Sequence, residues 1–160
     1  LPLQTGLLGK KGIARKAMKE CYKAYERSLR YWPDNTMVLN NYAYFLSLEG
    51  RDLERALAMA GRAIVLEENN PTYLDTYAWV LYRLGRYDEA KKTMQQALSL
   101  DRSQSPDLQL HYGDILAALG EKFMAEVYWK KALEGGYDDP DAIVERFRRL
   151  KEAAQTPAAP

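Results

Sequence analysis

The sequence is poor in the side chains that build metal and catalytic centres. Its 160 residues contain one cysteine, Cys21, and one histidine, His111. Zinc sites take three or four protein ligands, so a zinc site made from Cys and His alone is excluded. An internal disulfide is excluded because it needs a second cysteine. Paired carboxylates, nucleophile–base pairs and Gly-rich phosphate loops are also missing, so we predict no catalytic residues, no metal and no other cofactor.

Long apolar runs and an excess of charge of one sign are missing as well. No stretch approaches the roughly 18 apolar residues of a membrane-spanning helix, and no signal peptide is visible. Lys and Arg number 23 and Asp and Glu 22, a net charge of +1, which draws the whole chain neither to nucleic acid nor to an anionic membrane. Because the chain begins Leu1-Pro2 without Met, we expect a piece of a longer or processed protein. Its compartment stays open between cytoplasm and bacterial periplasm or envelope.

What the sequence does contain is a repeat with a period of about 35 residues. Gly50, Gly85 and Gly120 keep this spacing, as do two columns of small residues and a column of Tyr followed by Ala or Gly. Small residues mark close helix crossings, so we expect both small columns to be buried, Cys21 included. The columns are Cys21, Ala56, Ala90 and Ala125; Ser28, Ala63, Ala97 and Ala132; and Tyr42-Ala43, Tyr77-Ala78 and Tyr112-Gly113, with Leu46, Leu81 and Leu116 after them.

Start and stop signals divide each unit into two helices joined by a short turn. The glycines fall between two helical patterns, where a helix end takes a left-handed residue. Asn70-Pro71, Ser105-Pro106 and Asp139-Pro140 each put a capping side chain before a proline at the first helical position. Strand signals are absent. The predicted helices cover residues 13–32, 36–49, 53–67, 71–84, 87–100, 106–119, 122–134 and 140–152.

The unit at residues 71–104 resembles the tetratricopeptide repeat almost column by column. The resemblance rests on Tyr77-Ala78, Leu81, Gly85-Arg86-Tyr87-Asp88-Glu89-Ala90 and Ala97-Leu98. It implies an all-α fold, a right-handed superhelical solenoid of helix-turn-helix repeats with a C-terminal capping helix. The units are a partial, degenerate first repeat at 1–35, repeats at 36–70, 71–104 and 105–139, a capping helix at 140–153 and a tail at 154–160.

The two ends of the predicted array differ. Three glycines between residues 3 and 12 make that segment a weak helix, since each interior glycine costs about 1 kcal/mol. At the other end, Ile143, Phe147 and Leu150 lie on one face of a helix that we expect to cover the last repeat. The alternative for this helix is binding to a partner or to a membrane surface. An uncovered end would allow self-association.

By the same resemblance, the first helix of each pair lines a concave wall that binds a partner. We expect Trp79 to be the leading contact, because an exposed Trp beside two tyrosines is a typical binding hot spot. The alternative is that Trp79 packs against a neighbouring repeat. His111 falls near the edge of the predicted site. The candidate residues of the site are Asn40, Tyr44, Asp75, Trp79, Tyr82, Arg83 and Asp114.

Charge gives two further expectations. Asp75 and Asp114 would face the groove and favour a basic or amide-rich partner segment. Between Lys10 and Arg30, eight basic residues stand against two acidic ones, a local charge of +6. This segment is either a solvated helix face or a patch for phosphate groups or an acidic partner.

These observations favour a protein-interaction scaffold that binds a peptide or partner segment in the concave groove. One alternative is a helical-repeat RNA-binding module, but an RNA-binding wall is expected to be basic, and the predicted wall carries two Asp residues, so we expect no nucleic acid. Another alternative is a regulatory or assembly region of a larger protein, for example an envelope lipoprotein.

Overall fold

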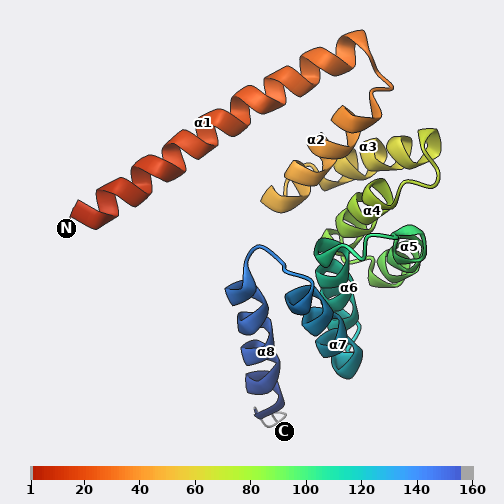
Figure 1. Ribbon diagram of the computed structural model, residues 1–160. Helices are drawn as coiled ribbons and strands as arrows, with labels where there is room; N and C mark the ends of the chain where they lie inside the picture. Colours follow the sequence, from red (N-terminus) through yellow and green to blue (C-terminus); the bar gives the residue numbers. More distant parts are fainter. Residues whose placement is uncertain (1, 156–160) are drawn as a thin grey trace, which may run out of the picture.

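The computed structural model describes the backbone of residues 2–155 and the side chains of residues 14–155. Within this part of the chain every regular element is an α-helix, which confirms the predicted all-α fold. Figure 1 shows the helices stacked one after another in chain order, as in a helical-repeat solenoid. They are α1 (Pro2–Tyr31), α2 (Thr36–Glu49), α3 (Leu53–Leu66), α4 (Pro71–Arg83), α5 (Tyr87–Leu100), α6 (Pro106–Ala118), α7 (Lys122–Glu134) and α8 (Pro140–Gln155).

Helices α2 to α7 form three pairs, α2 with α3, α4 with α5, and α6 with α7. The chain turns within each pair at a left-handed glycine, with φ of 68° at Gly50, 78° at Gly85 and 80° at Gly120. Glycine adopts this conformation without the steric cost that a Cβ atom brings. The helix-turn-helix pattern predicted from the glycine spacing is therefore confirmed for these pairs.

Proline begins α4, α6 and α8 as predicted, but only two of the three preceding side chains act as caps. Asn70 Oδ1 accepts hydrogen bonds from two backbone N–H groups in the first turn of α4, at 3.0 and 3.2 Å. Asp139 Oδ1 accepts one from the first turn of α8, at 3.1 Å. Ser105 makes no capping bond, so that prediction is wrong. Its own N–H donates instead to Asp101 Oδ2 at 2.7 Å, which organises the turn before α6.

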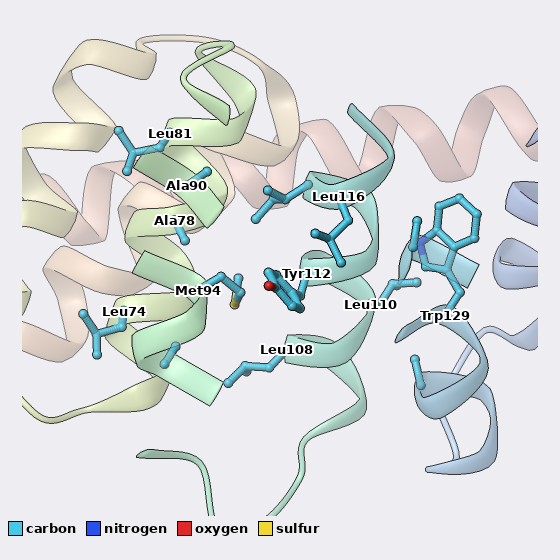
Figure 2. Packing of buried hydrophobic residues seen from close by; sticks show 14 of the residues in the cluster. Leu74, Ala78, Leu81, Ala90, Met94, Leu108, Leu110, Tyr112, Leu116 and Trp129 are labelled. Atoms are coloured by element: carbon cyan, nitrogen blue, oxygen red, sulfur yellow. The ribbon is translucent and has the colours of Figure 1, made fainter. Parts of the chain in front are cut away.

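Small residues allow the helices of each pair to approach closely. Gly113 is the extreme case, because a Cβ atom there would lie 2.4 Å from Cδ1 of Trp129. Trp129 itself is buried. Figure 2 shows the larger core cluster, with Leu81 and Met94 on one side and Leu116 and Trp129 on the other. The small-column residues of the three pairs are all fully buried: Ala56, Ala63, Ala90, Ala97, Ala125 and Ala132.

The N-terminal helix departs from the prediction in two ways. We expected a strong helix only from residue 13, but α1 begins at Pro2 and its three glycines do not interrupt it. Figure 1 shows it as a long rod that extends away from the stack. We also expected Cys21 to be buried, and it is exposed. Tyr22 and its neighbours Met18, Tyr25 and Leu29 pack against the cluster containing α2, and Cys21 lies at the border of this face, where no helix of the described chain covers it.

The C-terminal helix α8 covers the last pair, as predicted. Ile143 is fully buried, and Phe147 and Leu150 pack against the same core cluster. The Phe147 ring meets the Trp129 ring edge-on, with centroids 5.6 Å apart. The helix ends at Gln155, three residues beyond the predicted helix end at residue 152. Of the predicted tail, residues 156–160 lie outside the described residues.

Candidate binding groove

The first helices of the three pairs bring four rings together. Trp79 of α4 stacks on Tyr82 one turn later, with ring centroids 4.7 Å apart, and on His111 of α6, at 4.2 Å. Tyr44 of α2 reaches the same histidine, with centroids 6.5 Å apart. Three successive first helices thus contribute rings to one surface. We call this surface the aromatic floor and define it as Tyr44, Trp79, Tyr82 and His111.

Trp79 is buried in this floor rather than open to solvent. Only 8% of its surface is exposed, so the expectation of a solvent-facing ring is wrong and the alternative, packing against a neighbouring repeat, is correct. The ring belongs to neither hydrophobic core cluster. Tyr44 and Tyr82 remain partly exposed above it. The sequence missed the role of His111, although its position one helix turn from the predicted wall residues is the signal that could have placed it there.

Asp75 and His111 form a buried pair that ties α4 to α6. His111 Nδ1 lies 2.8 Å from Asp75 Oδ1. Burial by itself lowers the pKa of His111, but the carboxylates around it, Asp75 first and then Asp114 and Asp107, together outweigh burial, so the pKa of His111 is raised above its ordinary value. The Asp75 carboxylate also adds to the effect of burial in raising the pKa of the Tyr44 hydroxyl.

Asp114 is also occupied within the chain. Arg146 of α8 donates to both of its carboxylate oxygens, at 2.7 and 2.8 Å, and Trp129 Nε1 donates to Oδ1 at 2.9 Å. The hydrogen bonds to Asp114 raise the pKa of the Arg146 guanidinium. Asp75 and Asp114 therefore do not face the groove as open charges, which corrects that expectation. Nothing in the sequence indicated this pair, because Arg146 is a polar residue on a helix whose apolar face was the visible feature.

Three buried polar atoms on the first helices have no hydrogen-bond partner among the described residues. Gln109 Oε1 of α6 lies beside α5 and α7, whereas Asn40 Oδ1 of α2 and Trp79 Nε1 of α4 belong to the predicted site. The Asn40 side chain uses only its amide hydrogen, in a long 3.4 Å bond to Asn41 Oδ1. Asn40 and Trp79 are both more than nine-tenths buried. Buried donors and acceptors are nearly always paired in native proteins, so an unpaired acceptor and donor indicate places where a ligand or water completes the bonding.

Arg83 is the predicted site residue that stands apart from the others. It is exposed at the end of α4, and its guanidinium lies against the turn after α2, where a Cβ atom on Gly50 would come within 2.9 Å of it. The other six predicted residues lie on α2, α4 and α6 and are buried or partly buried.

The groove continues into a cleft between α8 and the first helices. The cleft has a volume of about 530 Å³. Tyr82, Ala117 and Trp129 contribute an apolar surface from α4, α6 and α7, and Arg146 and Arg149 border it from α8. Helix α8 therefore acts both as the cover of the last pair and as one wall of the site.

The described residues form neither a metal-binding cluster nor a membrane-spanning helix. No group of three or more His, Cys, Asp or Glu side chains lies close enough to hold a metal ion among residues the structure describes. In the same part of the chain, no helix combines the length and apolar character needed to cross a bilayer.

Sequence comparison identifies the repeat. Residues 71–103, which form α4 and α5, match the profile of the tetratricopeptide repeat. A relative, the TPR repeat-containing protein PA4667 of Pseudomonas aeruginosa, is 30% identical over 93 residues. Residues 71–103 are a tetratricopeptide repeat. The match covers 56% of this chain and 15% of the relative, so the chain spans only a small part of that protein's length.

Solved structures agree on the array's fold. The type III secretion translocator chaperone SycD of Yersinia enterocolitica superimposes with a TM-score of 0.63 at 19% identity, over 77% of this chain and 96% of that chain. The first TPR of Spaghetti (RPAP3), bound to an HSP90 peptide, gives 0.64 at 18% identity, over 76% and 94%. At these identities the likeness concerns the fold. The matched repeat supports a protein-interaction module.

Proposed function

We propose that the concave face of α2, α4 and α6 binds an extended peptide segment of a partner protein. The observation that carries the proposal is the pair of unpartnered buried atoms, Asn40 Oδ1 and Trp79 Nε1. One accepts and the other donates a hydrogen bond. A peptide main chain offers both complementary groups, a C=O and an N–H, at every residue except proline.

The surroundings of these atoms suit a peptide. Tyr44 and Tyr82 are partly exposed above the buried Trp79 and offer apolar area with little side-chain entropy to lose. The carboxylates of Asp75 and Asp114 are already paired with His111 and Arg146, so they would hold the wall rigid rather than attract a basic ligand. The binding of an HSP90 peptide by the first TPR of Spaghetti (RPAP3), a protein of the same fold, supports the peptide class.

The test uses a random peptide library displayed on phage, followed by titration of enriched peptides against three variants. Tyr44→Ala removes a partly exposed ring and should weaken binding by about 2 kcal/mol, as hot-spot residues do. Trp79→Phe keeps a stacked ring but removes the N–H donor, and should weaken binding by roughly 0.5–1.5 kcal/mol. Phe123→Ala, at a 75% exposed ring on the second helix α7, is the matched control and should leave affinity unchanged.

Thermal unfolding of each variant separates binding from folding. Trp79→Phe is preferred to Trp79→Ala because truncating a buried ring would remove the stack on His111 and lower stability as well. A library that enriches no peptide, or peptides whose affinity depends on Phe123 but not on Tyr44, would contradict the proposal and move the site to the outer face.

A further inference from the structure

The exposed face of α1 carries the strongest local charge that the structure describes. Between Ala14 and Tyr31 there are six cations and two carboxylates, a net charge of +4. Because the whole chain has a net charge of +1, all remaining residues together carry −3. The positive charge is therefore concentrated on one helix. The cations are Arg15, Lys16, Lys19, Lys23, Arg27 and Arg30, and all six are exposed.

Their spacing puts them on one side of the helix. Lys16, Lys19, Lys23 and Arg27 follow one another at three or four residues, the separation of neighbours along one helix face. Over α1 the cations extend for roughly 22 Å at 1.5 Å per residue. The two carboxylates neutralise only part of this face, since Glu20 pairs with Lys23 at 3.1 Å and Glu26 is turned towards Arg55 of α3, at 2.6 Å.

The cationic face ends in exposed apolar side chains. Tyr31 lies one turn after Arg27 and is 74% exposed, and Trp32 follows at 67%. The two rings contact each other, with centroids 6.2 Å apart. No helix of the described chain buries them, although Trp and Tyr are among the costliest side chains to leave in water. This is a second feature of the surface, independent of its charge.

Exposed aliphatic side chains also lie on the two helices that the turn after α1 contacts. Arg62 of α3 donates to both oxygens of Asp34, at 2.8 and 2.9 Å, and fixes the turn on the end of α3. Thr36 Oγ1 donates to Glu67 at 2.6 Å in the same region. Met37, at the start of α2, and Val65, near the end of α3, are exposed there. We name the set Tyr31, Trp32, Met37 and Val65 the apolar edge.

We infer that α1 and the apolar edge form a docking surface for an anionic phospholipid bilayer. Cations in a row attract the phosphate headgroups, and the apolar edge inserts among them, so the surface combines the two signals that stable peripheral binding needs. Single-stranded RNA would match the cations and the two rings but would leave Met37 and Val65 without a partner, because aliphatic side chains do not stack on bases. The lipid surface accounts for all four members of the edge.

The protein contains its own reporter for the test. Trp79 and Trp129 are buried and Trp32 is exposed. A shift of tryptophan emission on binding therefore reports a change in the surroundings of Trp32. The chain is titrated with vesicles of phosphatidylcholine alone and with vesicles containing about one third phosphatidylglycerol. We expect binding and a blue shift of emission only with the anionic vesicles, and at least tenfold weaker binding when salt is raised from about 0.1 M to about 0.5 M. In Trp32→Phe the blue shift should disappear while sedimentation with anionic vesicles persists.

Charge-matched variants decide whether the position of the cations matters. Replacing Lys16, Lys19, Lys23 and Arg27 with Gln should lower vesicle affinity at least tenfold. The control replaces four exposed cations elsewhere, Lys92, Arg102, Lys122 and Lys130, with Gln and should change affinity less than twofold.

Three results would overturn the inference. Equal losses in the two charge variants would mean that net charge alone acts, and equal binding to neutral and anionic vesicles would exclude headgroup recognition. Displacement from vesicles by polyuridylate at lower concentration than by inositol hexaphosphate would identify single-stranded nucleic acid as the ligand. None of these results depends on Tyr44 or Trp79, so the inference and the proposed groove stand or fall separately.

Discussion

Helix α1 and the second helices α3, α5 and α7 share the same column of small residues but not the same surroundings. In α3, α5 and α7 the column residues Ala56, Ala90 and Ala125 are fully buried, whereas the corresponding Cys21 in α1 is exposed. The difference is the neighbour. Each of the three inner helices packs against the first helix of its own pair, and within the described chain α1 has no such partner. A repeat column therefore predicts burial only where the complete unit is present.

The two terminal helices extend this comparison. Helix α8 buries Ile143 completely and fixes Arg146 on Asp114, so it belongs to the core. Among residues 14–31 of α1, Tyr22 is the one buried core residue, and the six cations of this segment lie in solvent. The comparison predicts that substitutions in α8 affect the stability of the array, and that equivalent substitutions on the open face of α1 do not.

The largest effect should come from Ile143→Ala. Removing most of a fully buried side chain leaves a cavity beside the last pair, so we expect the free energy of unfolding to fall by about 2–5 kcal/mol. The neighbouring Val144→Ala is the control and should stay within about 0.5 kcal/mol, because Val144 is exposed. Chemical denaturation measures both. A small loss for Ile143→Ala would mean that α8 does not cover the array in solution.

An intermediate effect is expected where the small column is enlarged. Ala90→Leu should destabilise by about 1–3 kcal/mol through overpacking, because Ala90 lies at a close helix crossing. The same column position in α1, changed as Cys21→Leu, should alter stability by less than about 0.5 kcal/mol. If Ala90→Leu and Cys21→Leu lowered the denaturation midpoint equally, α1 would be packed in the same way as the inner second helices, which contradicts the comparison.

The smallest effect is the pH dependence of stability. It distinguishes the buried charge of His111 from the exposed charges of α1. The pKa of His111 is raised in the folded state, so the protonated form adds stability that is fully present below the ordinary value of 6.5. This contribution is lost as pH rises through the higher folded-state pKa, with a slope of at most about 1.4 kcal/mol per pH unit. In a pH series of denaturation curves, His111→Gln should remove this slope. A wild-type slope unchanged in that variant would assign it to another group.

The sequence was sufficient for the helix pairs because each pair is specified by local chemistry. A glycine that must adopt a positive φ, a proline at a first helical position and an apolar period of a helix are all visible in one stretch of chain. The incorrect predictions from the sequence had a different origin. Ser105 has the right residue type for a cap, yet it makes no capping bond, and the turn before α6 is organised instead by Asp101, which accepts a hydrogen bond from the Ser105 N–H.

The candidate site could be predicted only in part. The period placed Tyr44, Trp79 and Asp114 at one position of successive first helices, and the structure keeps all three on those helices. Whether each points into solvent or into a neighbour depends on residues far away in sequence. Trp79 is covered because His111, 32 positions later, stacks on it, and Asp114 is occupied because α8 returns to the groove.

The sequence by itself determined the repeat, the two-helix unit and the covering role of α8, since these follow from spacings and residue types within about one period. Only the tertiary structure decided which of the predicted surface groups stay available. It buried Trp79, and it paired Asp75 with His111 and Asp114 with Arg146. It left Cys21 and the described cations of α1 exposed. The physical reason is that exposure and charge pairing depend on contacts between successive units, and a periodic sequence repeats the units without stating which neighbour each side chain will meet.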